Sequence, residues 1–514
     1  MDSLHTLAVN TIGPVVDVLE SFSWIGVNTH FVKHAVLDQQ VADIANSMAL
    51  DVTLLKYILA MFAVYPFSIM LYNIPNKTAK HAFSFVVGFA LVQWIFGPDW
   101  IHTFITGLGT YLICAILPAK VQPRVAFLFV MGYMVGAHIY RMYVSYMSGL
   151  FDFTGTQMVL TMKLTSFAYN MYDGTYDKKN VFPEKPHENK RKAKVYADRS
   201  RFAITKLPNP IEFFGYVYCF TCILAGPAFE YKDYERAIDG TAYRVDGEKG
   251  AIKKPATLLA GFQRLLVGAV MLVMHMKLSA MFPVSVMYSA EFIRTVPWAE
   301  RYGRLMVAML AERFKFYFAW KVAEGASILG GFGFEGYTKE GKPIGWKGVE
   351  NIDIMGFETA TSVQSISRHW NKRTQGWLER YTYHRAGRSV MVTYFISALW
   401  HGLYPGFFIM FMTLPIMTNI ERLIKSKINP IIVPGFDGYD LKTYPNNFAG
   451  WAYWVACWVC TMAFMNYVVQ VFSMGSLENS LMALSGHHYL PHIVLVIVYV
   501  LLELFPSPKK SKSA

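Results

Sequence analysis

The chain has 514 residues, of which 54% are hydrophobic, 16% aromatic and 16% charged, and its formal net charge is +13. This composition excludes a set of water-soluble domains, in which about a quarter of the residues are charged. The basic excess does not indicate a nucleic-acid partner, because lysines and arginines cluster in short loops between apolar stretches, as in membrane proteins of fixed orientation. The sequence therefore predicts an all-α polytopic membrane protein, with the lipid bilayer as its surroundings.

Apolar stretches near the roughly 20 residues needed to span a bilayer recur along the chain. They lie at about 54–73, 82–98, 100–118, 125–146, 157–171, 211–227, 256–282, 302–330, 389–412, 449–474 and 485–505. Only helices and closed barrels satisfy their backbone in hydrocarbon, so these stretches predict roughly ten to eleven transmembrane helices. Residues 54–505 are predicted to form a single membrane domain, with a lumenal or interfacial segment at 1–53 and a basic cytosolic tail at 506–514.

The basic loops predict the orientation of the chain in the membrane. The densest cluster of lysines and arginines, at 173–208, is expected in the cytoplasm together with the basic connections near 77–80 and 120–124. Residues 1–50 are poor in these side chains and therefore lie on the opposite side. They lack a basic flank and a small-residue cleavage site, so no removable signal peptide is expected.

Two acidic residues lie at the ends of predicted membrane segments. They are Asp173, in "YDG", and Glu230, in "GPAFEY". Acidic side chains at such positions commonly cap helices or face water. We keep both as candidate site residues.

Several motifs look like metal or cofactor sites but favour simpler interpretations. "CFTC" at 219–222 and "CWVC" at 457–460 have the spacing of zinc ligands, yet both lie in apolar runs predicted as helices, where small packing residues are expected. "GFGFEG" at 331–336 follows an apolar helix instead of a strand, so a loop is expected and not a dinucleotide site. "HHYLPH" at 487–492 is expected to be an interfacial cluster. No metal and no cofactor is predicted.

The stretch 367–388 is strongly basic and is followed by an apolar run that contains His401. The stretch 367–388 holds six lysines and arginines and one glutamate, and this positive excess predicts that it lies in the cytoplasm. If a helix enters the membrane near Ser389, His401 lies about 18 Å deep, around the middle of the bilayer. An ionisable side chain at that depth either packs with a hydrogen bond or lines a cavity or pathway.

The residues after the histidine favour the cavity. Gly402, Pro405 and Gly406 are expected to break the helix just beyond His401. The stretch 421–427, "ERLIKSK", is again basic, so the chain is expected to turn back near Pro405 and return to the cytoplasm.

The predicted C-terminus is cytosolic and ends in "SPKKSKSA". Lys510 and Lys512, fifth and third from the end, resemble the dilysine retrieval signal of endoplasmic-reticulum membrane proteins. The alternative is a solvated basic tail. We expect a multi-pass protein of the endoplasmic reticulum membrane.

Four stretches are informative when taken together. They are "QMVLTMKLTSFAYNMYDG" at 157–174, "LAGPAFEYKDY" at 224–234, "ISRHWNKRTQGWLERYTY" at 366–383 and "ALWHGLYPGFF" at 398–408. With the length and hydropathy of the chain, they resemble the membrane-bound O-acyltransferase family, in its lysophospholipid acyltransferase branch. The sterol and diacylglycerol branch typically has an Asp-Trp-Trp run before its asparagine, whereas this chain has "SRHWN", which favours the phospholipid branch.

The resemblance implies a helical fold around an intramembrane reaction chamber, with the family's two signature polar residues at Asn371 and His401. It implies transfer of a fatty acyl group from acyl-CoA, as co-substrate, to the free hydroxyl of a lysophospholipid. Such a reaction needs a base for the hydroxyl proton and a donor for the carbonyl oxygen. A histidine kept neutral by apolar surroundings suits the first role, and Asn371 orients the reacting groups or stabilises the oxyanion. Coenzyme A is a good leaving group, so no metal or covalent intermediate is required.

Other candidate residues follow from their places beside these two. Arg368, Lys372 and Arg373 either contact the phosphates of coenzyme A or only fix the topology. The other candidates are chamber residues suggested by the family pattern, namely Trp370, Trp400, Glu230 and Asp173. Trp370 and Trp400 either shape the chamber or anchor the chain at the membrane interface.

Three alternatives stay open at this point. A related enzyme of the same family acts on a protein hydroxyl or a neutral lipid. A transporter also buries polar residues among many helices, but the repeated halves typical of transporters are not visible. An inactive scaffold is disfavoured by the intact Asn371 and His401.

Overall fold

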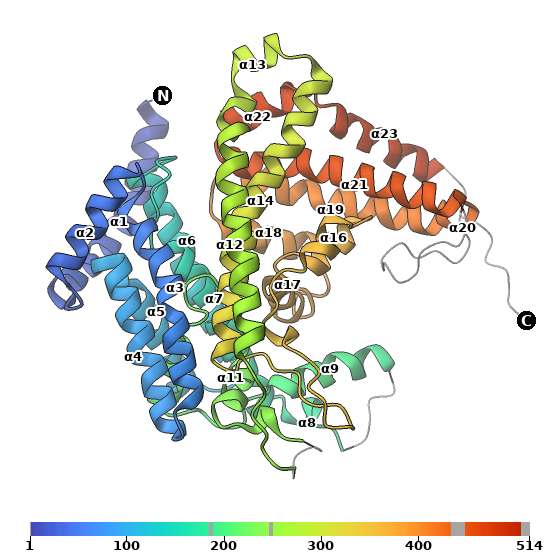
Figure 1. Cartoon of the computed structure of the whole chain (residues 1–514). Coiled ribbons are helices and arrows are strands. Elements are labelled where there is room, and N and C mark those ends of the chain that lie inside the picture. Colours follow the sequence, from blue (N-terminus) through green and yellow to red (C-terminus); the bar gives the residue numbers. More distant parts are fainter. Residues whose placement is uncertain (1, 185–188, 246–249, 433–447, 505–514) are drawn as a thin grey trace, which may run out of the picture. The chain divides into compact units, whose positions relative to one another are not determined.

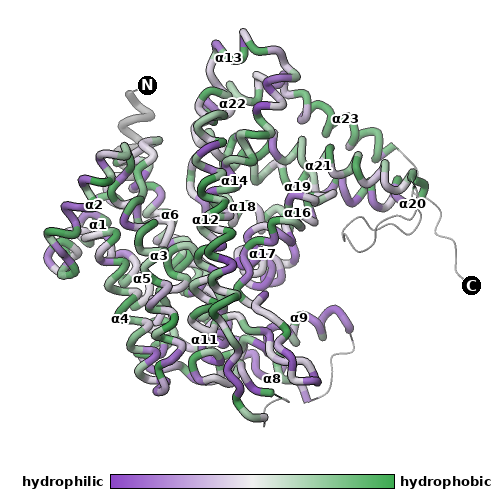
Figure 2. Tube along the Cα trace, in the orientation of Figure 1, coloured by the Kyte–Doolittle hydropathy of each residue, from purple (hydrophilic) through white to green (hydrophobic). Residues whose placement is uncertain are grey.

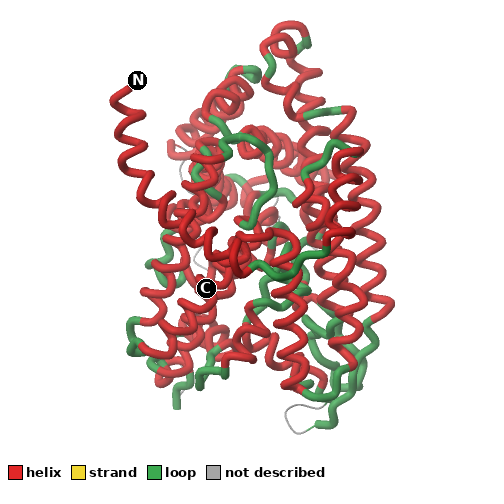
Figure 3. Tube along the Cα trace, turned by 90° about the vertical axis from the view of Figure 1, so that its left-hand side faces the viewer, coloured by secondary structure: helices red, strands yellow, loops and turns green. Residues whose placement is uncertain are grey.

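The computed structural model describes residues 2–184, 189–245, 250–432 and 448–504. Over these residues Figure 3 shows helices and loops only, and extended backbone pairs at two isolated β-bridges, Arg244 with Ile252 and Tyr337 with Pro343. The predicted all-α class is therefore confirmed for the described part of the chain. The chain forms two compact units, unit 1 (Met1–Gly268 and Ala319–Glu350) and unit 2 (Ala269–Phe318 and Asn351–Ala514).

Unit 1 contains the N-terminal helices shown from blue to green in Figure 1. They are α1 (Asp2–Thr29), α2 (Ala35–Ser47), α3 (Val52–Asn73), α4 (Lys77–Phe96), α5 (Trp100–Ile116), α6 (Gln122–Val144), α7 (Thr154–Thr175), α8 (Lys178–Val181), α9 (Lys190–Phe202), α10 (Pro210–Val217), α11 (Tyr231–Ile238) and the beginning of α12 (Leu258–Met281). Short polar side chains start several of them: Asp51 accepts from the Leu54 N–H at the start of α3, and Asn76 accepts from the Ala79 N–H at the start of α4. Helix α6 packs on α7, and α4 packs on α3 and α10.

Unit 2 contains the remainder of α12 and the helices that carry the candidate site. They are α13 (Ala290–Thr295), most of α14 (Trp298–Leu329), α15 (Ile354–Glu358), α16 (Val363–His369), α17 (Lys372–Trp377), a π-helical turn (Leu378–Tyr383), α18 (Val390–His401), α19 (Pro405–Lys427), α20 (Asn429–Ile432), α21 (Phe448–Met474), α22 (Leu477–Ser485) and α23 (Leu490–Leu504). Helix α19 packs against α18, α21 and α23, so it forms the centre of this group.

Six helical runs among the described residues are long and apolar enough to cross a membrane. They are Val52–Asn73, Lys77–Ile116, Gln122–Val144, Leu258–Tyr288, Pro405–Lys427 and Phe448–Met474, and the bent pair α22 and α23 makes a seventh candidate. Figure 2 shows the hydrophobic residues along α23 in green and the hydrophilic residues of α9 in purple. The protein is therefore a multi-pass membrane protein, and the count of ten to eleven spans stays a prediction.

The predicted spanning helix at 211–227 is wrong. Helix α10 ends at Val217, and the chain continues through turns to Glu230. The "CFTC" motif therefore lies in turns and not in a helix, and both Cys219 and Cys222 are completely buried. The stretch is apolar because it is enclosed by protein, and hydropathy alone does not distinguish such a segment from one that faces lipid.

A buried lysine satisfies the backbone at the end of α10. The Lys163 side chain, on α7, is 1% exposed, and its Nζ donates to the carbonyl oxygens of Tyr216 at 2.5 Å and Val217 at 3.2 Å. Ser84, on α4, donates to the carbonyl oxygen of Gly215 at 2.8 Å. Backbone carbonyls away from water need such donors, so these side chains stabilise the irregular path.

Replacement of Lys163 by methionine is expected to destabilise the protein. The change leaves two buried carbonyl oxygens without the ammonium donor, at a cost of about 1–3 kcal/mol for each lost partner. The thermal unfolding midpoint of the detergent-purified protein measures the effect, with Lys178→Met on the exposed face of α8 as the control. An unfolding midpoint equal to that of the wild type would show that the segment does not depend on this lysine.

Candidate active site

Helix α18 carries His401 at its C-terminal end. The Ser389 side chain accepts a hydrogen bond from the Val392 N–H and starts the helix, as the sequence predicts. The helix ends at His401 because Gly402 adopts φ 134°, a conformation that favours glycine, and α19 then begins at Pro405. The predicted break is confirmed, and the 12 residues of α18 put His401 about 18 Å from its start.

The imidazole of His401 is half-buried among aromatic rings. Its centroid lies 4.7 Å from the neighbouring Trp400 ring and 5.1 Å from the Phe411 ring of α19, which stacks on it. Phe472 of α21 approaches edge-on at 5.1 Å, and Phe407 lies at 6.2 Å. Three helices therefore hold this histidine in an apolar setting, and they leave part of its surface open.

Asn371 begins the short helix α17 in an unusual backbone conformation. Its φ of 42° and ψ of 52° lie in the left-handed region, where asparagine is better tolerated than other side chains with a Cβ. The Thr374 hydroxyl donates to the Asn371 Oδ1 at 2.9 Å. The amide is therefore held with its oxygen toward α17, so its NH2 group remains to act as a hydrogen-bond donor.

A segment before α16 encloses the residues around Asn371. The carbonyl oxygen of Asn351 accepts from the Lys372 N–H at 2.8 Å, and the Asp353 N–H donates to the His369 carbonyl oxygen at 3.0 Å. The His369 Nδ1 lies 3.0 Å from the Asp353 Oδ2, and this hydrogen bond holds the pKa of the Asp353 carboxyl well below its usual range. Four residues of this region are not predicted from the sequence, namely Thr374, Asn351, Asp353 and His369. His369 and Thr374 lie within three positions of Asn371, but nothing local marks Asn351 or Asp353.

Two tryptophans connect the neighbourhood of Asn371 with that of His401. Trp377, the last residue of α17, has its ring centroid 6.1 Å from that of Trp400, and both side chains are buried. The π-helical turn after Trp377 also packs on α18. Unit 2 thus contains both predicted signature residues, joined through one short helix and one aromatic contact.

The other predicted residues of the 367–388 stretch divide into two groups. Trp370 lies in an aromatic cluster, with ring centroids 5.7 Å from Phe316 and 5.0 Å from Phe357, so its packing supports the backbone next to Asn371. Arg368 is exposed, and Lys372 and Arg373 are half-buried, so three cationic residues lie within three positions of Asn371 in the chain.

Glu230 and Asp173 lie in unit 1, whereas Asn371 and His401 lie in unit 2. Glu230 is buried and accepts a hydrogen bond from the Asn170 Nδ2 at 2.9 Å. Asp173 is buried and pairs with Arg199, which also pairs with Asp177.

Burial by itself lowers the pKa of the Arg199 guanidinium, but its hydrogen bonds and charge pairing with Asp173 and Asp177 outweigh burial and raise it. Arg199 therefore stays charged. Its ion pair with Asp173 joins α9 to the end of α7. Glu230 and Asp173 thus each have a protein partner, Asn170 and Arg199, that explains their burial.

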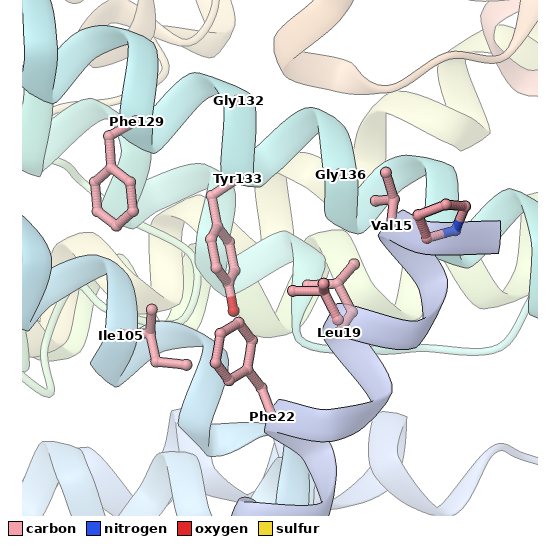
Figure 4. A pocket seen from close by; sticks show the side chains of 10 residues that line it. Val15, Leu19, Phe22, Ile105, Phe129, Gly132, Tyr133 and Gly136 are labelled. Carbon is pink, nitrogen blue, oxygen red and sulfur yellow. The ribbon is translucent and has the colours of Figure 1, made fainter. Parts of the chain in front are cut away.

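An apolar cavity of about 400 Å³ lies in unit 1 (Figure 4). Its walls come from three helices: Pro14, Val15, Val18, Leu19 and Phe22 of α1, Ile105 of α5, and Phe129, Gly132, Tyr133 and Gly136 of α6. None of the predicted site residues is among them. The cavity offers little polar surface for acid–base chemistry, so we do not include it in the candidate active site.

Comparison with known proteins identifies the family of the chain. Residues 139–470 match the family model of MBOAT, the membrane-bound O-acyltransferase family. The chain is 30% identical over 443 residues to membrane-bound glycerophospholipid O-acyltransferase 2 of Rattus norvegicus, covering 84% of this chain and 80% of the relative. It is 29% identical over 474 residues to the lysophospholipid acyltransferase of Schizosaccharomyces pombe, covering 89% and 87%.

The match to membrane-bound glycerophospholipid O-acyltransferase 1 of Homo sapiens is 28% over 462 residues, covering 87% of this chain and 88% of the relative. The protein belongs to the membrane-bound O-acyltransferase family, as the sequence motifs predicted. It is thus an O-acyltransferase, and both Asn371 and His401 lie within the matched range.

Proposed function

We propose that the protein is a lysophospholipid acyltransferase, which transfers a fatty acyl group from acyl-CoA to the free hydroxyl of a lysophospholipid. One observation carries the substrate class: relatives matched over four fifths or more of their length are named glycerophospholipid or lysophospholipid acyltransferases. The half-buried histidine at the break between α18 and α19 supports the chemistry, because acyl transfer to an alcohol needs a base.

His401 acts as the general base in the proposed reaction. The neutral imidazole takes the proton of the lysophospholipid hydroxyl while that oxygen attacks the thioester carbonyl carbon. The carbonyl oxygen becomes an oxyanion, to which the Asn371 NH2 group donates a hydrogen bond. The carbon–sulfur bond then breaks, the new ester is released, and the imidazolium returns its proton to the coenzyme A thiolate. The chain's own side chains supply each step.

The surroundings of the two residues suit the two substrates. Coenzyme A carries several phosphates, and Arg368, Lys372 and Arg373 offer positive charge beside Asn371. The aromatic rings around His401, with Trp400 among them, offer an apolar wall to the acyl chain. Trp370 packs on Phe316 and Phe357 and supports the backbone beside Asn371. For Glu230 and Asp173 the bonds to Asn170 and Arg199 favour a structural role.

The proposed location is the endoplasmic reticulum membrane, with the C-terminus in the cytosol. Lys510 and Lys512, which resemble a dilysine retrieval signal, lie outside the described residues. Two long helices, α12 and α14, separate the basic segments 173–208 and 367–388 in sequence. We take both helices as crossings, although α14 is not among the six apolar runs named above. Two crossings return the chain to the same side, so that both basic segments face the cytosol, where acyl-CoA is delivered.

A panel of acceptors tests the proposed function. Purified protein is incubated with labelled acyl-CoA and lysophospholipids that carry choline, ethanolamine, serine or inositol headgroups, and the products are identified. A diacyl phospholipid is expected with at least one of them, and about a thousandfold less of it with the His401→Ala variant. Labelled peptide or neutral lipid in place of phospholipid would instead support the alternative acceptors, and no transfer to any lysophospholipid would contradict the proposal.

A further inference from the structure

The backbone of Asn371 is held in a conformation that needs support from its neighbours. A residue with a Cβ adopts the left-handed region at an energetic cost, and it stays there only where surrounding contacts determine it. Asn371 is followed directly by α17, and its own carbonyl oxygen accepts from the Gln375 N–H at 2.9 Å. Asn371 is therefore held in place by the helix that follows it.

The segment 351–356 fixes the chain on both sides of Asn371. After Asn371, the Asn351 carbonyl oxygen accepts from the Lys372 N–H at 2.8 Å, and the Asn351 Oδ1 accepts from the Arg373 N–H at 3.2 Å. Before it, the Asp353 N–H donates to the carbonyl oxygen of His369 at 3.0 Å. These three hydrogen bonds leave the backbone of Asn371 little freedom to leave the left-handed region.

The same segment also fixes the side chain of His369. The Asp353 Oδ2 lies 3.0 Å from the His369 Nδ1, while the Asp353 Oδ1 accepts from the Gly356 N–H at 3.1 Å. A Cβ at Gly356 would lie 2.3 Å from the His369 Nδ1, so only glycine lets this turn approach the ring so closely. The segment is thus packed tightly against the residues that precede Asn371.

Thr374 determines the orientation of the Asn371 amide. Its side chain is buried at 5% exposure, one helical turn after Asn371, and its hydroxyl donates to the Asn371 Oδ1 at 2.9 Å. A carboxamide has an acceptor end and a donor end, and here the acceptor end is held toward Thr374. The donor end is then the end that Thr374 does not hold, and a fixed N–H donor is what a developing oxyanion requires.

We propose that Thr374 and the segment 351–356 are positioning elements for acyl transfer. Thr374 turns the Asn371 NH2 group toward the reacting carbonyl, and the segment holds the Asn371 backbone so that this orientation is kept. The inference rests on the proposed role of Asn371 as the oxyanion donor. It assigns a function in the reaction to four residues outside the family's signature pair, namely Asn351, Asp353, His369 and Thr374.

Thr374→Val and Thr374→Ser test the proposal. Valine keeps the shape of threonine and removes the hydroxyl, so kcat is expected to fall about 10- to 100-fold because the amide loses its fixed orientation. The KM values for acyl-CoA and for the lysophospholipid are expected to stay within about twofold, since substrate binding is untouched. Serine keeps the hydroxyl and is expected to restore most of kcat. An equal thermal unfolding midpoint for both variants establishes that they are folded.

A double variant shows whether Thr374 acts through Asn371. Thr374→Val is expected to lower kcat in the wild-type background and to have little further effect when Asn371 is already alanine. An unchanged kcat in Thr374→Val, a change confined to KM, or a failure of serine to restore activity would overturn the inference. Wild-type protein that transfers nothing to any lysophospholipid overturns the proposed function and this inference with it, whereas active wild type with equally active Thr374→Val overturns the inference alone.

Discussion

Replacement of His401 by alanine is expected to reduce acyl transfer by about a thousandfold, because a positioned general base contributes roughly 10²- to 10⁴-fold. The variant retains the ring of aromatic side chains from α19 and α21, and its helix still ends at Gly402. It is therefore expected to fold. Product formation from labelled acyl-CoA, measured in the presence of a saturating lysophospholipid, gives the size of the loss.

A second histidine of unit 2 provides the matched control. His275, on α12, is half-buried and its Nδ1 lies 2.8 Å from the Ala311 carbonyl oxygen, so its place in the structure is explained by packing. His275→Ala is expected to keep most of the wild-type kcat. If His401→Ala also transferred at close to the wild-type rate while remaining folded, His401 would not be the base.

Two substitutions at Asn371 separate its conformational role from its chemical role. Glycine adopts the left-handed region without strain, whereas alanine does not, so Asn371→Gly is expected to keep the start of α17 and Asn371→Ala to weaken it. Both remove the amide, and loss of one oxyanion donor typically lowers kcat by about 10²- to 10³-fold. We expect a loss of this size in both variants, with a higher thermal unfolding midpoint for glycine.

Asn371→Asp completes this comparison. Aspartate keeps an oxygen for the Thr374 hydroxyl but replaces the NH2 donor with a negative charge, so kcat is expected to be at least as low as in Asn371→Gly. Near-normal turnover in Asn371→Gly would show that asparagine serves only the backbone turn, and the proposed oxyanion role would be withdrawn.

The sequence alone predicted the class of protein and the local features of α18. Apolar stretches indicated α3, α4, α5, α6, α12 and α21, Ser389 marked the start of α18, and Gly402 and Pro405 marked its break after His401. The motif around Asn371 identified the family. These features were accessible because helix length, capping and helix breaking depend on residues close together in the chain.

Sequence did not reveal which apolar or polar residues are enclosed by protein. The stretch 211–227 has the hydropathy of a span but is folded around the ammonium group of Lys163. Hydropathy is a property of the residue and not of its surroundings. Only the contacts made by α7 show that 211–227 is enclosed by protein.

Only the tertiary structure brought Asn351 and Asp353 to the backbone beside Asn371. These residues precede Asn371 by some twenty positions and match no motif, and their contribution is a set of hydrogen bonds that exists only once the chain has turned back. The reacting groups are thus encoded locally, whereas their orientation depends on contacts between segments distant in sequence. That difference is why the sequence identified Asn371 and His401 and the structure was needed to find what holds Asn371 in place.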